Sequence, residues 1–410
     1  MRHRGLTSSP ARPLTGRTLL ILLAIVVIGL PVAAGLIDEG ADHVGDFSVV
    51  LWVGWLSCAV LVPIALTHAL SLSGPEATPG LALAYDGLPL LLTAAWVLLA
   101  GSILTSHWLL ALTAAGLCAY HLTLVIPRFV ADPVPRWARS SPRVSVCVAN
   151  VYVDNVTPDL AADAVVRSGA DVIVIVESNP TFMEAFDRRG GLLAYPNRVF
   201  DADDHSDYAV TIASRVDLLS GSQVHISASL RCAAAIVQVG ARHVTIVGLH
   251  AMATVDPNGY RTWGEQIEEL TALIPTFDGP LVIAGDLNAT GYRPEFRKLL
   301  RIGLRDAHDS LGKGLNASFK LSASGPLGIG AIVRLDHALI GHGVCAMEVA
   351  NLPPNGSDHL PFVVDLAVQQ LSGRPKLRRL RRRRTQRLRR TGRRLRLRSR
   401  SRSRRRRRKR

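Results

Sequence analysis

The chain has 410 residues, of which 48% are apolar, and a net charge of +16, and it is long enough for two or three domains. Residues 374–410 contain 22 Arg, two Lys and no acid, so the rest of the chain carries −8. The high pI therefore does not indicate a basic, nucleic-acid-binding body. The five cysteines lack CxxC spacing, which argues against a zinc site or a disulfide framework, and we expect buried free thiols.

The first third of the chain is strongly apolar, and a membrane helix needs about 20 such residues. We predict a transmembrane region over 18–127 with about four helices, at 18–37, 49–70, 87–104 and 108–127. The last two are divided only by Thr105–His107, so three spans are the alternative. The first segment could instead be a signal peptide, because a basic stretch precedes it.

The charges beside these segments bear on orientation. Residues 1–17 carry four Arg, whereas the first loop carries four acids and no base, which favours a cytoplasmic N-terminus. Arginines also follow the last span. Four spans place the rest of the protein in the cytoplasm and three place it outside. We therefore expect a multi-pass protein of the cell membrane, with both orientations of its globular domain open.

A Pro- and Arg-rich linker over 128–142 leads into a globular domain, predicted over 143–368. The run 171–176 is apolar throughout, which is typical of a strand buried on both faces. A helix is predicted over 158–168, with Thr157 before it and Gly169 after it. Several strands follow one another without a helix between them. This α/β pattern favours mixed sheets packed face to face, with helices outside, over a doubly wound sheet.

Polar side chains stand where the predicted strands end. Each alone has an ordinary explanation, such as a turn, a cap, a core histidine or, for Asp336, a pair with Arg334. A buried ionised carboxylate is nevertheless costly unless something compensates it. Several such groups at strand ends indicate one shared site. The residues are Asn150, Glu177, His250, Asp286, Asn288, Asp336, Asp358 and His359.

Hydrolysis of a phosphate ester would explain this set. Mg²⁺ prefers oxygen ligands and needs only one or two carboxylates, which Glu177 with Asn150 or Asp358 could supply. It would polarise a phosphoryl oxygen. An attacking water needs a proton acceptor, and His359, oriented by Asp336, titrates in a suitable range. No Cys or GxSxG nucleophile is evident, which favours direct attack by water.

These residues, in this order, resemble the endonuclease/exonuclease/phosphatase family, a deoxyribonuclease-like group. Gly285–Asn288 is similar to the family's Gly-Asp-Phe-Asn element, and Ser357–His359 to its closing Ser-Asp-His. The resemblance covers about residues 143–368. It implies a four-layer α/β sandwich, two mixed sheets flanked by helices, here preceded by an all-α transmembrane region. It also implies Mg²⁺ or Mn²⁺ as the cofactor, held by three side chains: Asn150, Glu177 and Asp358.

The resemblance further implies catalytic roles for five residues. His250 would contact the phosphate or the leaving group. Asp286 and Asn288 would position water and phosphate, and Asp336 would be the partner of His359. The second glutamate of deoxyribonucleases has no clear counterpart. Asp207, in the acidic segment 201–208, could replace it, although a solvated loop is the simpler interpretation.

The sequence also constrains the substrate. The domain has few Lys or Arg and no basic stripe with aromatics, which disfavours duplex DNA relative to a lipid-linked or small phosphate or pyrophosphate. Membrane-bound relatives thought to act on polyprenyl phosphates have a similar layout, with the domain facing outward. A membrane-tethered endonuclease or exonuclease is one alternative, and an inactive polyanion-binding scaffold is another.

The tail 374–410 is too densely charged to pack, and we predict that it is disordered. It could bind anionic lipid headgroups or an RNA-like polyanion, or it could be a solvated extension. Because a membrane is expected nearby, anionic lipid is the favoured partner. The oligomeric state is not predictable from these features.

Overall fold

The computed structural model describes residues 49–71, 79–200, 209–222, 230–320 and 331–370. The N-terminal 17 residues, the predicted span 18–37, the acidic segment with Asp207 and the Arg-rich tail lie outside the described residues. The described residues from Val49 to Gln369 belong to one compact unit. All five cysteines are buried free thiols, as predicted.

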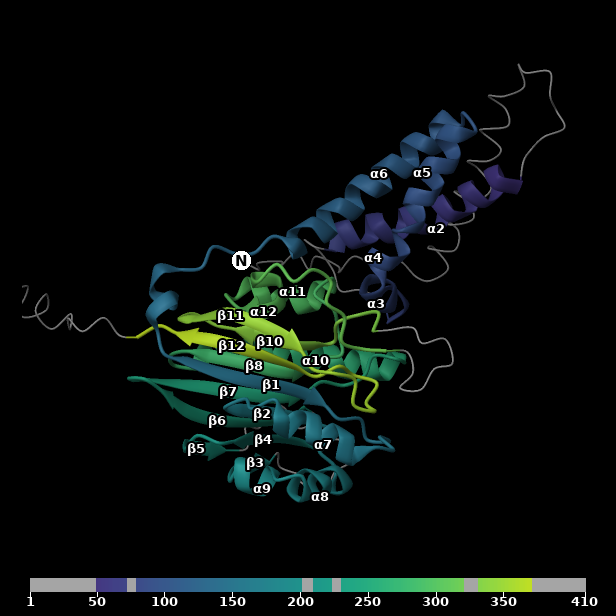
Figure 1. Ribbon diagram of the computed structural model, residues 1–410. Helices are drawn as coiled ribbons and strands as arrows, with labels where there is room; N and C mark the ends of the chain where they lie inside the picture. Colours follow the sequence, from purple (N-terminus) through teal and green to yellow (C-terminus); the bar gives the residue numbers. More distant parts are fainter. Residues whose placement is uncertain (1–48, 72–78, 201–208, 223–229, 321–330, 371–410) are drawn as a thin grey trace, which may run out of the picture. The chain divides into compact units, whose positions relative to one another are not determined.

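The N-terminal part of the described chain is helical (Figure 1). Its helices are α2 (Val49–Ser71), α3 (Pro79–Asp86), α4 (Leu88–Leu91), α5 (Ala94–Leu104) and α6 (Trp108–Val125). The positive φ of 60° at Ser106 accompanies the break between α5 and α6. Two segments, Leu51–Ser71 and Trp108–Phe129, are long and apolar enough to cross a membrane. The helix pair Gly80–Asp86 and Leu88–Leu104 is bent by 72°. It would form a third span only if the two helices are parts of one broken span.

The first β-sheet has six strands in the order β11-β12-β1-β2-β4-β3. Their bounds are β1 (Arg143–Asn150), β2 (Val172–Val176), β3 (Asn197–Phe200), β4 (Val210–Ser214), β11 (Val344–Asn351) and β12 (Phe362–Val368). Strands β1 and β2 are parallel, and the other neighbours are antiparallel. The sheet is therefore mixed.

The second sheet also has six strands, in the order β5-β6-β7-β8-β10-β9. Their bounds are β5 (Leu218–Ser222), β6 (Arg231–Val239), β7 (Arg242–His250), β8 (Leu281–Asp286), β9 (Arg305–Asp306) and β10 (Asp336–Ile340). Only β7 and β8 are parallel. Each sheet thus has one parallel pair near its centre.

The two sheets pack face to face through alternate apolar residues, such as Val146 on β1, Val174 on β2 and Val282 on β8. The intervening residues face the helices instead, because successive side chains on a strand point to opposite faces. Helices α7 (Pro158–Arg167) and α8 (Pro180–Arg188) cover the outer face of the first sheet.

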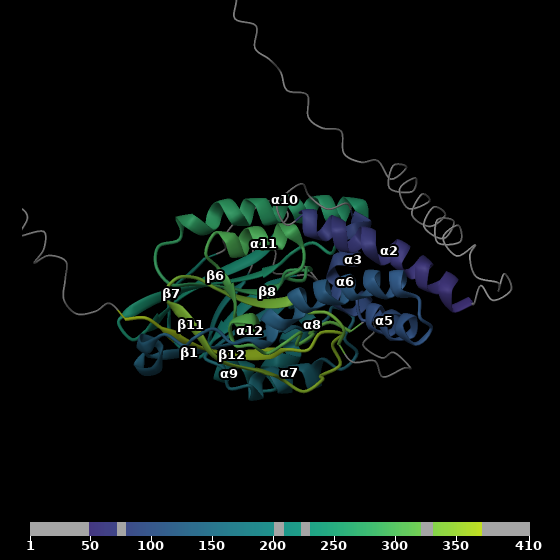
Figure 2. The same ribbon diagram turned by 90° about the horizontal axis from the view of Figure 1, so that it is seen from above.

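Helices α10 (Pro257–Leu273) and α11 (Pro294–Arg301) cover the outer face of the second sheet. Figure 2 shows α10 and α11 on one side of the sheets, and α7 and the short α9 (Gly191–Ala194) on the other. The predicted arrangement of two mixed sheets flanked by helices is confirmed, and the apolar helices precede it in the chain.

The predicted linker is not extended along its whole length. It contains the short helix Arg136–Ser140, and the buried Ala138 packs against Cys345 and Ala367 of the first sheet. The backbone N–H of Asp132 also donates to the carbonyl of Ser310. The connection is therefore held against the sandwich at several points.

Candidate active site

The intersheet core ends in polar residues at one end. On β8, the buried Ala284 is followed at the next inward position by Asp286. Inward positions recur every second residue, so a polar residue at the last one extends the core without interrupting it. The same change from apolar to polar occurs in three other strands at this end of the core. Its residues are Asn150 on β1, His250 on β7 and Asp336 on β10.

Strand register brings three of these residues into one row. His250 on β7 is paired with Asp286 on β8, and Asp286 is paired in turn with Asp336 on β10. Residues paired across strands project to the same face of a sheet. The second sheet therefore presents an imidazole between the sheets together with two carboxylates.

The first sheet contributes Asn150 and, directly after β2, Glu177. The Asn150 side-chain amide donates to Glu177 Oε1 at 3.0 Å and to Asp286 Oδ2 at 3.2 Å, which connects the two sheets. His250 Nε2 lies 3.7 Å from Glu177 Oε1 and 3.9 Å from Asp286 Oδ2. These four residues, distant in sequence, meet in one place.

Two of the predicted site residues have left-handed backbone conformations. Glu177 has a φ of 59° and Asn288 a φ of 48°, a region that costs a non-glycine residue about 1 kcal/mol or more. At Glu177, the turn lets the backbone N–H of Val153 donate to Oε2 at 2.7 Å. Gly285 is required next to Asp286, because its φ is 141° and a Cβ there would lie 2.0 Å from the carbonyl oxygen of Leu249.

His359 and Asp336 form a buried pair. His359 Nδ1 and Asp336 Oδ2 are 2.6 Å apart, and the Ser318 hydroxyl donates to the same oxygen at 2.7 Å. Because Nδ1 faces Asp336, Nε2 faces the centre of the site, 3.8 Å from Asp286 Oδ2. Burial alone would lower the pKa of His359, but the charges of Asp336 and Asp286 outweigh it and raise the pKa to about 10.

The carboxyl groups of the site differ in the direction of their pKa shifts. Burial raises the pKa of Asp286, and the attraction of His359 and His250 only partly offsets this. Burial and the nearby charge of Glu177 also raise the pKa of Asp358, against the attraction of His359. By contrast, the pKa of Asp336 is lowered, because its charge-assisted bond to His359 outweighs its burial. The site thus gathers four carboxyl groups and two imidazoles at one end of the core.

The remaining predicted residues lie at the margin. The backbone N–H of Asn288 donates to Asp286 Oδ1, while its side-chain amide donates to the carbonyl of Ala251. Asp358 is half-buried next to the Ser357 hydroxyl, at 3.5 Å. Arg334 does not pair with Asp336; it forms ion pairs with Asp309 at 2.7 Å and with Asp306 at 3.6 Å.

Three residues that support the site were not predicted. The Ser318 hydroxyl holds the Asp336 carboxylate, and the Phe319 ring lies 5.0 Å from the His359 ring. The Ser357 hydroxyl donates to the carbonyl of Asn150 and accepts from the N–H of His359, which ties the loop before β12 to the end of β1. Ser357 stands in the closing Ser-Asp-His, but no local pattern marks Ser318 or Phe319, which reach the site only through tertiary pairing.

Two positions for a cation can be compared. Asp286, Asp336 and His359 offer ligand atoms within 4.8 Å of one another. However, the Asp336 oxygen nearest His359 is already held by that ring and by Ser318. Asn150, Glu177 and Asp358 offer the oxygen donors that a hard divalent cation prefers.

The sequence and the fold of the sandwich were compared with those of known proteins. Residues 147–359 match the sequence model of the Endonuclease/Exonuclease/phosphatase family. No curated protein matches the chain. Among solved structures, TDP2 from D. rerio, complexed with a single-strand DNA product, is 16% identical with a TM-score of 0.46. Family proteins from Beutenbergia cavernae and Bacteroides vulgatus are 15% and 16% identical, with TM-scores of 0.44 and 0.45. The three alignments cover 55% of this chain and 99%, 72% and 99% of the respective structures.

Proposed function

Because the chain belongs to the endonuclease/exonuclease/phosphatase family, we propose that it is a membrane-anchored, divalent-metal-dependent phosphoesterase. Its substrate is a lipid-linked or small phosphate ester or pyrophosphate, and water attacks the phosphorus directly. The observation that carries the proposal is the convergence of Asn150, Glu177, His250, Asp286 and the Asp336–His359 pair at one end of the intersheet core.

The metal site would consist of Glu177, Asn150 and Asp358. A bound Mg²⁺ or Mn²⁺ supplies a Lewis acid that polarises a phosphoryl oxygen and offsets developing negative charge. Glu177 is preorganised for this role, because the N–H of Val153 and the Asn150 amide fix its two oxygens. The carboxyl groups that gather here support a cation at this place.

The protonation states assign the other roles. A histidine with a pKa raised to about 10 is protonated at neutral pH, so His359 is suited to hold a phosphate oxygen with its Nε2–H. We therefore propose Asp286, in place of His359, as the acceptor of the water proton, because it lies within 4 Å of both histidines and burial raises its pKa. Water would transfer its proton to Asp286 as its oxygen bonds to phosphorus and the bond to the leaving oxygen breaks.

Two more residues have roles at this centre. His250 Nε2 lies within 4 Å of both Glu177 and Asp286, so it is placed to donate to the leaving oxygen. Asp336 is a positioning residue, because it contacts His359 and not the substrate. Its hydrogen bond fixes the ring so that Nε2 faces the site.

The membrane anchor rests on Leu51–Ser71 and Trp108–Phe129, which are long and apolar enough to span a bilayer. A lipid-linked substrate would be concentrated beside an anchored enzyme. Nuclease activity is the alternative, but a body with a net charge of −8 is unfavourable for a polyanion such as duplex DNA. The Arg-rich tail would add contacts to anionic lipid.

A substrate panel tests the proposal. The full-length protein in detergent is assayed with a long-chain alkyl phosphate, the corresponding diphosphate, p-nitrophenyl phosphate and supercoiled plasmid, each with Mg²⁺, Mn²⁺ or chelator. We expect metal-dependent phosphate release from the alkyl substrates. Asp286→Asn and His359→Gln should each lower kcat by about 10³-fold or more.

His243→Gln is the matched control, because His243 is an exposed histidine on the same strand as His250. It should retain wild-type activity. Phosphate release that survives chelator or both site variants would reject the proposed centre. Plasmid nicking that is faster than phosphate release from every small substrate would favour the nuclease alternative.

A further inference from the structure

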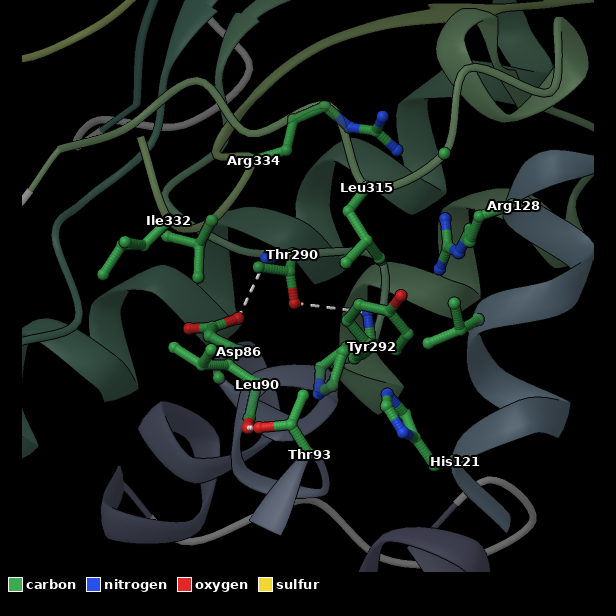
Figure 3. A pocket seen from close by; sticks show the side chains of 16 residues that line it. Asp86, Leu90, Thr93, His121, Arg128, Thr290, Tyr292, Leu315, Ile332 and Arg334 are labelled. Atoms are coloured by element: carbon green, nitrogen blue, oxygen red, sulfur yellow. Dashed lines mark hydrogen bonds between the residues drawn. The ribbon is translucent and has the colours of Figure 1, made fainter. Parts of the chain in front are cut away.

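The two candidate spans end beside the loop 290–293 of the sandwich. His68, in the last turn of α2, places Nε2 2.7 Å from the carbonyl oxygen of Tyr292. Arg128, just after α6, places its guanidinium carbon 4.7 Å from the centroid of the Tyr292 ring. Figure 3 shows Arg128 and Tyr292 at a pocket of about 230 Å³ between the helices and the sandwich. The loop leads directly into α11, which therefore begins where the spans end.

Exposed apolar side chains continue to the end of the second span. Ile126, Phe129 and Val130 are 52%, 60% and 61% exposed. Side chains of this kind are unfavourable in water, and an anchored chain would place them in lipid. Basic side chains at the end of a span extend to the lipid headgroups, so Arg128, which stands among these residues, lies at the headgroup level of an anchored chain.

A second arginine reaches the same place from α11. Nε of Arg297 donates to the carbonyl oxygen of Gly291 at 3.3 Å. A Cβ added to Gly291 would lie 2.8 Å from Nη2 of Arg128, so both guanidinium groups are neighbours of one glycine. Burial lowers the pKa of Arg297, and the like charge of Arg128 lowers it further. Positive charge is thus gathered at this place.

The two arginines differ in their partners. Arg128 is balanced by an ion pair with Asp309. Arg297 forms no ion pair with any residue that the structure describes, and its one side-chain hydrogen bond to those residues is to Gly291. Its Nη1 and Nη2 have no partner among the same residues, yet neither atom is fully buried. A ligand at the surface can therefore reach both donors.

The surface of α11 adds to this charge. Arg301 lies one turn further along the helix and is exposed, and its charge also lowers the pKa of Arg297. Residues four apart on a helix are neighbours on its surface. Glu295 is the only acid in α11, but it is 3% exposed and accepts from the hydroxyl of Tyr260 at 2.8 Å. Arg128, Arg297 and Arg301 therefore form a basic surface that no acid of this helix offsets.

We propose that this basic surface binds the phosphate of an anionic phospholipid headgroup, in the leaflet that meets the sandwich. Nη1 and Nη2 of Arg297 donate to the phosphate oxygens, and Arg301 adds attraction at longer range. The neighbouring exposed side chains of Ile126 and Phe129 favour a lipid over a soluble polyanion, because a headgroup arrives together with acyl chains. The inference rests on the membrane anchor in the proposed function and not on the catalytic centre.

Thermal unfolding in nanodiscs tests the basic surface without requiring turnover. The full-length protein is placed in nanodiscs of phosphatidylcholine and in nanodiscs of phosphatidylglycerol, and the shift in Tm between the two is measured for each variant. A ligand that binds the folded state raises the Tm. The wild-type protein should show a positive shift, and Arg297→Gln should lose about half of it. The Arg-rich tail is the same in every variant, so its contribution cancels when the shifts are compared.

Arg167→Gln is the matched control, because the Arg167 side chain is 77% exposed and lies on α7, which covers the outer face of the other sheet. It should keep the whole shift. Arg301→Gln changes an exposed position and should lose a smaller part of the shift than Arg297→Gln. If Arg297→Gln did not fold, Arg301→Gln would decide, and an unchanged shift in that variant would overturn the inference.

Other outcomes would also overturn the inference. Among them are the absence of a shift in the wild-type protein and equal shifts in Arg297→Gln and Arg167→Gln. If inorganic phosphate raised the Tm in phosphatidylcholine nanodiscs as much as phosphatidylglycerol does, the surface would recognise free phosphate instead of a headgroup. If the protein did not enter nanodiscs, the proposed membrane anchor would fail, and this inference with it. Hydrolysis is measured separately, so a failure of the proposed catalytic centre would leave the Tm result standing.

Discussion

The helical region and the sandwich distribute their side chains in opposite ways. In the sandwich, the apolar strand residues are buried and the charged groups of the site gather at one end of the core. In the helices, large apolar residues are exposed, among them Leu104 at 85%, Val97 at 74% and Leu112 at 72%, while His68 is fully buried. Exposed apolar surface on this scale is unfavourable in water, so the helices suit a lipid environment.

This contrast also explains where function collects. The buried polar groups of the helices, such as His68 and Asp86, contact the loop Thr290–Arg293 of the sandwich. That loop follows β8, the strand that carries Asp286. The two regions therefore meet beside the candidate site, which would bring a lipid-borne substrate to it.

The largest effect should come from placing an aspartate at an apolar position of each region. Val174→Asp places a carboxylate between the two sheets, where Val174 is fully buried, and should destabilise the fold by more than about 4 kcal/mol. Leu112→Asp changes an exposed position of α6 and should leave thermal unfolding of the sandwich nearly unchanged. It should instead reduce membrane association, at a cost of about 3 kcal/mol.

Thermal unfolding in detergent and membrane fractionation measure the two outcomes. If Leu112→Asp left membrane association intact, α6 would not be in contact with lipid. If both variants lost the same stability in detergent, the exposed faces of the helices would be packed in the protein, and the contrast between the regions would be lost.

The next effect concerns the contact between the regions. Asp86→Ala leaves the guanidinium of Arg293, which is 1% exposed, without its carboxylate partner. Removing one member of a buried pair costs about 3–5 kcal/mol, because the remaining charge is desolvated and unpaired. The free energy of unfolding should fall by this amount in denaturant titrations of the full chain.

A double variant separates charge burial from general damage. Asp86→Leu combined with Arg293→Met removes both charges and should recover most of the lost stability. A double variant no more stable than Asp86→Ala would show that the loop Thr290–Arg293 depends on the packing of these side chains rather than on their charges.

An effect of intermediate size should appear in the pH dependence of the free energy of unfolding. It arises in the sandwich alone. Burial, and the charge of Arg334, lower the pKa of His308 to about 3 against the attraction of Asp306. The unfolded chain takes up a proton below about pH 6.5, which the folded state resists, so stability declines as the pH falls from 6.5 towards 3. The decline is at most about 1.4 kcal/mol per pH unit.

His308→Phe should flatten this decline while keeping an aromatic ring against Phe362, which His308 contacts edge-on at 4.6 Å. Urea titrations between pH 4 and 6.5 measure the slope. His243→Gln, at an exposed histidine, should leave it unchanged. An unaltered slope in His308→Phe would mean that the titrating group lies elsewhere.

Much of the sandwich could be predicted from the sequence, because its central strands are continuous apolar runs. The apolar run 171–176 agrees within a residue with the observed β2. Four strands were missed, namely β3 (Asn197–Phe200), β5 (Leu218–Ser222), β9 (Arg305–Asp306) and β11 (Val344–Asn351). Three of them, β3, β5 and β9, are short edge strands, and the solvent-facing half of β11 carries polar residues, so their pairing is set by neighbours rather than by local pattern.

The site was predictable to a different degree. The sequence predicted its residues because they stand beside apolar, strand-like runs, but it did not reveal that inward alternation and strand register would align them. Ser318 and Phe319 follow no strand, and they reach His359 and Asp336 only through pairing across the fold. The pocket between the helices and the sandwich has no sequence signal, because its walls come from segments far apart in the chain.

The smallest effect concerns an ion pair like that of Asp86 and Arg293 but on the surface. Lys298 on α11 pairs with Glu268 on α10 at 2.9 Å, and these side chains are 33% and 60% exposed. An exposed pair contributes less than about 1 kcal/mol, because solvent screens it and two flexible side chains must be ordered. Lys298→Ala should therefore change the free energy of unfolding by about 0.5 kcal/mol, and less in 1 M salt. A loss as large as that of Asp86→Ala would mean that burial is not what distinguishes the contact between the two regions.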